Sequence, residues 1–144
     1  NFFGTLNCLH ALLPFLKKKN NSQIIFMSSV AGYRGLPYAA AYCSSKSAIT
    51  TFAESIYNQC KNLGIAIRVI NPGFVKTPLT DKNKFKMPMI IPVEKAADIM
   101  YKKIVFSKKF EINCPWLFCF IMKILRVLPN SVYFSLTQLL IKRL

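Results

Sequence analysis

The sequence predicts an α/β fold built on a parallel sheet, and three observations lead to this class. Two short apolar runs, residues 23–29 and 65–70, have the unbroken hydrophobicity of strands that are covered on both faces. Segments with helical periodicity lie before, between and after these runs. This alternation favours right-handed crossovers and parallel strands, whose ligands bind beyond the carboxyl ends of the strands. We therefore expect a site at Ser28–Ser29 and at Asn71–Pro72–Gly73, which follow the two runs.

The first half of the chain is expected to form two helices around the first strand. Apolar residues recur at helical spacing over residues 2–16, Lys17–Lys19 suit the C-terminal end of a helix dipole, and Asn20–Asn21 should end the helix. The glycines and the proline of residues 30–37 predict a loop. A long helix is expected from Ala40 to Leu63, because Gly64 suits the position after a helix. Its predicted buried stripe comprises Tyr42, Lys46, Ile49, Ala53, Ile56 and Cys60.

The second half is expected to continue the alternation and to end in an apolar tail. The strand at residues 65–70 is closed by Asn-Pro-Gly, and a helix is predicted over residues 92–106. Residues 108–113 are expected to form a short strand. Two apolar helices should follow over residues 116–128 and 132–141, separated by Pro129–Asn130. We therefore divide the chain into an α/β part, residues 1–113, and an apolar, basic helical tail, residues 114–144.

Composition excludes several classes of protein. A hydrophobic content of 53% is too high for a disordered chain. The net charge of +15 comes from scattered basic residues in which lysine outnumbers arginine, without a zinc-finger or RNP signature, so nucleic-acid binding is not expected. No apolar stretch is long enough for a spanning helix, and no signal-peptide pattern opens the chain, so a cytoplasmic protein is expected. The five scattered cysteines and the single His10 favour reduced thiols and no metal site.

Two Tyr-x-x-x-Lys pairs occur on the long helix, Tyr42–Lys46 and Tyr57–Lys61. Chance alone gives about 0.7 such pairs in a chain this rich in lysine, so the spacing by itself indicates nothing. Lys46 continues the predicted buried stripe, whereas the second pair shares a row with Thr50 and Glu54 that we interpret as a solvated flank. Only the first pair has a hydroxyl, that of Ser29, at the carboxyl end of a strand thirteen residues earlier.

A serine, a tyrosine and a lysine at one strand end form a coherent catalytic set. A phenol has an unperturbed pKa near 10 and is a poor proton donor or acceptor at neutral pH. A neighbouring ammonium favours the phenolate and lowers that pKa toward the working range. A serine hydroxyl can stabilise the charge that develops on a substrate oxygen. This set fits a carbonyl or alcohol substrate and a hydride carrier, for which nicotinamide is the usual choice.

The runs IIFMSSVAG, YCSSK and NPGFVKT together resemble the short-chain dehydrogenase/reductase family. The strand-end serine, the Tyr-x-x-x-Lys pair and the later Pro-Gly-x-x-x-Thr occur in the family's order and at ordinary spacings. The resemblance covers residues 1–80 closely and the remainder loosely. It implies a Rossmann-like, doubly wound parallel sheet and an oxidoreductase that uses NAD or NADP, of which we favour NADP.

The resemblance also assigns roles to individual residues. Ser29 would orient the substrate, Tyr42 would be the acid–base, and Lys46 would tune the tyrosine and hold the nicotinamide ribose beside it. The turn next to nicotinamide would comprise Pro72, Gly73 and Thr77, with Thr77 at the carboxamide.

Parts of the family pattern are absent. Neither the Gly-rich cofactor loop T-G-x-x-x-G-x-G nor the later N-A-G strand occurs, so we interpret the chain as the C-terminal part of a reductase that lacks the first strands and the cofactor-binding half. Asn1 stands where the family keeps a helix asparagine, which supports a proton relay to the lysine. Residues 78–92 would form a flexible lid over the site.

The tail leaves alternatives open. Residues 116–128 are too few to span a bilayer, but residues 116–144 could lie in a membrane interface and reach a lipophilic substrate, or could pack on the domain or on a second subunit. Three functions remain: an NAD(P)-dependent oxidoreductase acting on a carbonyl or alcohol, a truncated remnant that cannot bind cofactor, and a basic module for membrane surfaces. We expect the full-length protein to be a homo-oligomer.

Overall fold

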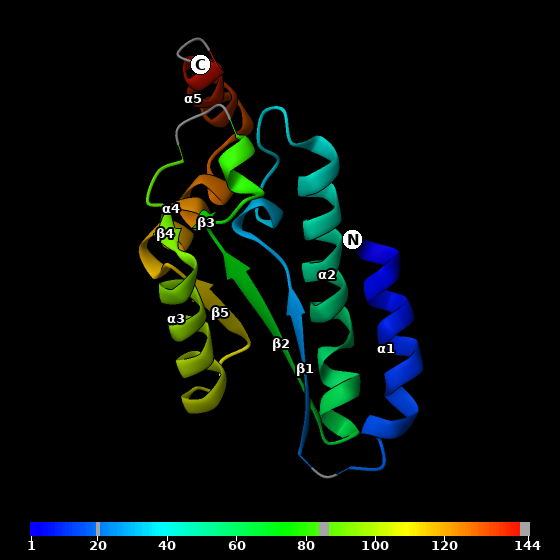
Figure 1. Ribbon diagram of the computed structural model, residues 1–144. Coiled ribbons are helices and arrows are strands. Elements are labelled where there is room, and N and C mark those ends of the chain that lie inside the picture. Colours follow the sequence, from blue (N-terminus) through cyan, green and yellow to red (C-terminus); the bar gives the residue numbers. More distant parts are fainter. Residues whose placement is uncertain (20, 84–86, 142–144) are drawn as a thin grey trace.

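The computed structural model describes residues 1–19, 21–83 and 87–141, and it confirms the predicted α/β class. Strands β1 (Ser22–Met27), β2 (Ile65–Pro72) and β5 (Glu111–Cys114) form a parallel sheet in the order β1-β2-β5. Phe26 of β1 is in register with Val69 of β2, and Val69 is in register with Glu111 of β5. The three strands therefore end at one edge of the sheet (Figure 1).

Helical crossovers connect the strands, as expected for parallel pairing. Helix α1 (Phe2–Leu16) precedes β1, α2 (Ala40–Asn62) joins β1 to β2, and α3 (Val93–Phe106) lies between β2 and β5. Figure 1 shows α1 and α2 together on one side of the sheet and α3 on the other. This is a partial version of the doubly wound, Rossmann-like architecture.

The main core lies between α2 and the sheet. Its buried members are Phe26, Ile49, Ala53, Cys60, Ile65, Ile67 and Val69. Ile49, Ala53 and Cys60 lie on one face of α2 at helical spacing, which confirms that part of the predicted stripe. Burial of each large apolar side chain contributes about 1.5–3 kcal/mol, so this layer fixes α2 against the strands.

The ends of the first elements differ slightly from prediction. α1 ends at Leu16, so the three lysines follow the helix instead of forming its last turn. Asn21 has a φ of 60°, the left-handed conformation that asparagine tolerates, while Asn20 lies outside the described residues. Strand β1 ends at Met27, two residues earlier than predicted. Gly64 has a φ of 72° just after α2, as its predicted position after the helix requires.

The segment that we predicted as a lid is anchored at both ends. Strand β3 (Val75–Lys76) pairs in parallel with β4 (Ile91–Pro92), and the short helix η2 (Thr80–Lys82) lies between them. The pairing was missed because two-residue strands carry no periodicity. Residues 84–86 of the predicted lid lie outside the described residues.

The C-terminal helices α4 (Trp116–Val127) and α5 (Asn130–Ile141) lie beside the strand ends. The inward side chains of α4 form a second core with the loop after β1, comprising Val30, Tyr33, Phe118, Cys119 and Met122. Arg34 from this loop donates hydrogen bonds of 2.7–3.1 Å to the carbonyl oxygens of residues 125, 126 and 128 at the end of α4, and one of 2.6 Å to Asn130 Oδ1. The guanidinium also lies 4.0 Å from the ring centroid of Tyr133.

Within the described parts of the chain, no helix is long and apolar enough to cross a membrane. Those parts also hold no group of three or more His, Cys, Asp and Glu side chains suited to a metal ion. All five cysteines are free thiols, and four of them are buried.

Candidate active site

Ser28 joins the end of β1 to α2. Its hydroxyl donates to the carbonyl oxygen of Lys46 at 2.9 Å and lies 2.8 Å from Thr50 Oγ1. Gly32 makes this approach feasible, because a Cβ there would lie 2.9 Å from the carbonyl carbon of Lys46. The contacts fix the loop after β1 against the helix that carries the tyrosine and the lysine.

Ser29 joins the two strand ends that the sequence predicted as the site. Its hydroxyl donates to the carbonyl oxygen of Pro72 at 3.3 Å and accepts the Ala31 N–H at 3.2 Å. The serine is buried at the start of the short helix η1 (Val30–Gly32), which its side chain caps. The end of β1 and the turn after β2 are therefore in direct contact.

Tyr42 and Lys46 lie on one face of α2 above the end of β1. The Lys46 ammonium donates to the carbonyl oxygen of Met27 at 2.9 Å and lies 5.8 Å from the ring centroid of Tyr42. Lys46 is half-buried, and this burial lowers the pKa of its ammonium. Tyr42 is 46% exposed, so the prediction that the buried stripe includes it is wrong: α2 extends past the core at this end.

The second Tyr-x-x-x-Lys pair lies away from the strand ends. Tyr57 is fifteen residues further along α2, about 22 Å at 1.5 Å per residue, toward the opposite end of the sheet. Its half-buried ring packs edge-on against Phe110 with centroids 5.5 Å apart. The prediction of a solvated flank is therefore wrong for Tyr57. It is also wrong for Thr50, which is buried against Ser28. Lys61 is exposed, as predicted.

The turn after β2 is packed against α4. The Gly73 N–H donates to the carbonyl oxygen of Cys114 at 2.7 Å, and a Cβ at Gly73 would lie only 2.5 Å from Phe118 Cδ1. Glycine is thus needed here for the neighbouring aromatic ring. Thr77 lies just beyond β3, where its N–H donates to Thr80 Oγ1 at 2.8 Å and its hydroxyl lies 3.3 Å from the same atom.

Asn1 lies beside α2 but forms no hydrogen bond with the lysine. Its amide donates to Ser45 Oγ at 3.4 Å, and the Ser45 hydroxyl donates to the carbonyl oxygen of Tyr42 at 2.8 Å. The asparagine therefore reaches the helix turn that carries Tyr42.

A buried polar network under the site was missed from the sequence. The Tyr33 hydroxyl donates to Asn113 Oδ1 at 3.0 Å and lies 3.4 Å from Glu111 Oε1, and Glu111 forms an ion pair with Lys123 of α4. Burial, and then the negative charge of Glu111, raise the pKa of Tyr33 well above its usual range. The Asn71 amide donates to Glu111 Oε1 at 3.4 Å, so the network supports the residue before Pro72.

The surroundings of Lys46 fit a nicotinamide ribose. An ammonium has three N–H donors, and among the described residues it has one hydrogen-bond acceptor, the Met27 carbonyl oxygen. The neighbouring Tyr42 is itself exposed. The five glycines of the chain form no Gly-rich loop at a helix N-terminus, the arrangement that commonly binds a pyrophosphate.

Comparisons with known proteins identify one family. Residues 1–87 match the family model described as short chain dehydrogenase. An uncharacterized oxidoreductase of Myxococcus xanthus is 35% identical over 133 residues, which cover 92% of this chain and 52% of that protein. The 3-ketodihydrosphingosine reductase of Bacteroides thetaiotaomicron is 31% identical over 113 residues, covering 78% of this chain and 42% of the relative.

A solved structure shares the fold. The short chain dehydrogenase of Burkholderia cenocepacia, in complex with NADP, superposes with a TM-score of 0.73 at 24% identity, covering 84% of this chain and 50% of that one. The chain thus spans about half the length of the proteins it matches. Taken with the family match over residues 1–87, these findings show that the chain belongs to the short-chain dehydrogenase/reductase family.

Proposed function

We propose that the protein containing this chain is an NAD(P)-dependent oxidoreductase that interconverts a carbonyl and a secondary alcohol. The observation that carries this proposal is the position of Lys46, whose ammonium lies at the end of β1, 5.8 Å from the ring of Tyr42. Bound nicotinamide would supply or accept the hydride at the substrate carbon. Solved structures of similar fold are in complex with NADP or with NAD, which supports a nicotinamide cofactor of either kind.

The residues of this chain would transfer the proton and orient the substrate and the cofactor. In the reductive direction, the Tyr42 hydroxyl would give its proton to the carbonyl oxygen as the hydride reaches the carbonyl carbon, so the product is neutral. The Lys46 ammonium would stabilise the resulting phenolate and bind the ribose. Ser29 would donate a hydrogen bond to the same substrate oxygen, exchanging its present acceptor, the Pro72 carbonyl oxygen. Pro72, Gly73 and Thr77 would lie along the nicotinamide, and Asn1 would support the proton relay.

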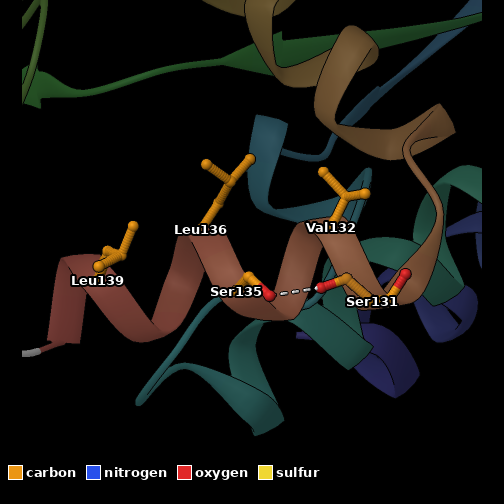
Figure 2. Close-up of a pocket in the computed structure, with 5 residues that line it drawn as sticks. All are labelled: Ser131, Val132, Ser135, Leu136 and Leu139. Atoms are coloured by element: carbon orange, nitrogen blue, oxygen red, sulfur yellow. Dashed lines mark hydrogen bonds between the residues drawn. The ribbon is translucent and has the colours of Figure 1, made fainter.

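We propose that the substrate is lipophilic. Figure 2 shows Val132, Leu136 and Leu139 projecting from one side of α5, where they line a shallow hollow, open to solvent, together with Ser131 and Ser135. Figure 1 places α5 at the end of the sheet toward which the strands point. Tyr133 fixes α5 there by donating to the Gly35 carbonyl oxygen in the loop that follows Ser29. The Bacteroides relative is named 3-ketodihydrosphingosine reductase, and this name supports the assignment.

Reductase activity is tested by following NADPH oxidation by the full-length protein with methyl ketones of increasing chain length. Each methylene buried in the hollow should raise kcat/KM about fourfold. Leu136→Ser should flatten this dependence, whereas Leu63→Ser, a similarly exposed leucine after α2, should not. No turnover with any ketone or alcohol would contradict the proposed reaction, and turnover independent of chain length would contradict only the lipophilic substrate.

Residues 1–144 alone are expected to show no saturable binding of NADPH or NADH, because the pyrophosphate would have no Gly-rich loop to bind. Equilibrium titration by calorimetry measures this directly. Tight binding by this chain alone would contradict the expectation.

We also propose that the full-length protein is a homo-oligomer. Helix α1 carries Phe3, Leu12 and Phe15 with more than half of each side chain's surface exposed, which is unusual for aromatic and aliphatic residues at such density. Sedimentation velocity would test this, and Phe15→Ser is the matched variant to weaken such an interface.

A further inference from the structure

Helix α5 is attached to the rest of the molecule at one place. Among the described side chains of α5, Tyr133 alone is buried. Its hydroxyl donates to the carbonyl oxygen of Gly35, and the guanidinium of Arg34 lies 4.0 Å from the centroid of its ring. Within the described parts of the chain, every hydrogen bond that joins α5 to a segment distant in sequence is made to Arg34 or Gly35. These two residues of the loop after β1 therefore anchor the helix.

Arg34 binds the end of α4 and the start of α5 at the same time. Its Nη1 donates to the carbonyl oxygens of residues 125, 126 and 128 at 2.7–3.1 Å. Carbonyl groups at the C-terminal end of a helix lack intrahelical partners, and the helix dipole attracts a cation there. The Nη2 of Arg34 donates to Asn130 Oδ1, at the first residue of α5, at 2.6 Å. One guanidinium thus fixes the corner between the two helices to the loop that follows Ser29.

The anchor also sets the direction in which the apolar side of α5 faces. Val132, Leu136 and Leu139 lie within about 60° of the helix circumference at 100° per residue, and Tyr133 lies about 100° from Val132. Figure 2 shows the three apolar side chains together on one side of the helix. A turn of α5 about its axis would take Tyr133 away from the Arg34 guanidinium and the Gly35 carbonyl oxygen. Arg34 therefore holds the hollow on α5 in its present orientation.

These contacts need the shape of an arginine side chain. The planar guanidinium has donors on separate nitrogens, which lets it reach the end of α4 and Asn130 together while its face lies on the ring of Tyr133. A lysine ammonium is a single point of positive charge on a flexible stem. Arg34→Lys would therefore keep the charge and lose the geometry.

We propose that Arg34 is a positioning residue that sets the chain-length preference of the enzyme by holding α5 beside the strand ends. Figure 1 shows α5 at the end of the sheet toward which the strands point. This inference rests on the proposed function, in which the apolar side of α5 receives the lipophilic part of the substrate. Arg34 would touch neither the substrate nor the cofactor. The loop that carries it also carries Ser29, so one loop would link recognition of the reacting oxygen to recognition of the apolar chain.

The first experiment measures the Kd of methyl ketones from 2-butanone to 2-nonanone for the full-length protein. Calorimetry is done with oxidised nicotinamide cofactor present, so that no ketone is reduced. In the wild type, each buried methylene should tighten binding about fourfold. Arg34→Lys should leave the Kd of 2-butanone within about twofold and raise that of 2-nonanone about fifteenfold, which corresponds to loss of cover over two methylenes. A partly unfolded variant would instead lower the number of binding sites and leave every Kd unchanged.

Two further variants frame this result. Arg126→Lys changes an exposed arginine at the end of the same helix α4 and should bind every ketone like the wild type. Asn130→Ala removes one of the hydrogen bonds of Arg34 at an exposed position, so it tests the anchor if Arg34→Lys does not fold. It should raise the Kd of 2-nonanone about three- to fivefold and leave that of 2-butanone unchanged.

Hydrogen exchange of the backbone amides tests the anchor without any ligand. Arg34→Lys should speed exchange in α5 about tenfold or more, while β1 and β2 keep their wild-type rates. Unchanged exchange in α5 would overturn the anchor.

The outcomes distinguish this inference from the proposed function. A loss of affinity that is equal for all ketones in Arg34→Lys, or no loss for any of them, overturns the role of Arg34. Wild-type binding that is independent of chain length contradicts the lipophilic substrate and overturns this inference with it. Chain-length-dependent binding that Arg34→Lys weakens, without turnover of any ketone, supports the role of Arg34 and contradicts the proposed reaction.

Discussion

The two Tyr-x-x-x-Lys pairs of α2 provide an internal test of the assigned acid–base. In the full-length protein, Tyr42→Phe removes the hydroxyl of an exposed residue, and this hydroxyl has no hydrogen-bond partner among the described residues. The free energy of unfolding should therefore change by less than about 0.5 kcal/mol. Loss of the proton donor should lower kcat by about 10²–10⁴-fold, which corresponds to roughly 3–5 kcal/mol of transition-state stabilisation.

Tyr57→Phe is the matched control. Its ring keeps the edge-on contact with Phe110, because the two centroids lie 5.5 Å apart and the hydroxyl forms no hydrogen bond among the described residues. The kcat should stay within about twofold of the wild type, and the free energy of unfolding should change by less than about 0.5 kcal/mol.

The assays are steady-state oxidation of NADPH and thermal unfolding monitored by circular dichroism. Equal losses of kcat in the two variants would refute the reasoning, because position beside the strand ends would then have no influence. A loss of kcat in Tyr42→Phe that is accompanied by a large drop in Tm would also refute it, since the effect would be structural.

Three further predictions follow from individual contacts. Ser28→Ala should lower the free energy of unfolding by about 1–3 kcal/mol, because the Ser28 hydroxyl forms hydrogen bonds with the Lys46 carbonyl oxygen and with Thr50. Ser29→Ala should instead lower kcat by about 10²–10³-fold. Denaturant titration and steady-state kinetics measure the two effects, and the same losses of stability and of kcat in both variants would contradict these separate roles. Arg68→Met should lower the free energy of unfolding by about 3–5 kcal/mol, because Arg68 is 4% exposed and its guanidinium donates to the carbonyl oxygens of residues 103, 104 and 109 at 2.7–3.0 Å. Arg126→Met, in contrast, should change the Tm little. A small loss of stability in Arg68→Met would contradict this account. Burial lowers the folded-state pKa of Lys46, so the unfolded state binds more protons, and the free energy of unfolding should rise with pH through the alkaline range up to about 10.4. Lys46→Met should reduce the slope of the free energy of unfolding against pH. An unchanged slope in urea titrations at several pH values would contradict this prediction.

Local patterns of the sequence determined most of the fold. The continuous apolar runs became β1 and β2, and the helical periodicity of residues 40–63 became α2 with Ile49, Ala53 and Cys60 buried. These elements form because alternation and periodicity act over a few residues, which is the range that a sequence pattern reports. The same patterns placed Ser29 and the Pro72–Gly73 turn at neighbouring strand ends, and the structure brings them into contact.

Element ends and surface faces were less predictable. Tyr42 continues the helical stripe by spacing, but it is exposed because α2 extends beyond the strand that covers its middle. Tyr57 and Thr50 looked solvated by spacing, but Phe110 and Ser28 cover them. In each case the deciding neighbour is distant in sequence, so the periodicity of α2 could not report it.

Only the tertiary structure decided how the tail and the site are joined. Arg34 reaches Asn130 across 96 positions, Tyr33 reaches Asn113 across 80, and Ser29 reaches Pro72 across 43. A single arginine or glutamate has no pattern of its own, and its partner depends on the path of the whole chain between them. The sequence by itself determined the strands of the three-stranded sheet, the long helices and the order of the serine, tyrosine and lysine. Contacts of long sequence separation decided that α4 packs with one face on the site and leaves its other apolar face exposed.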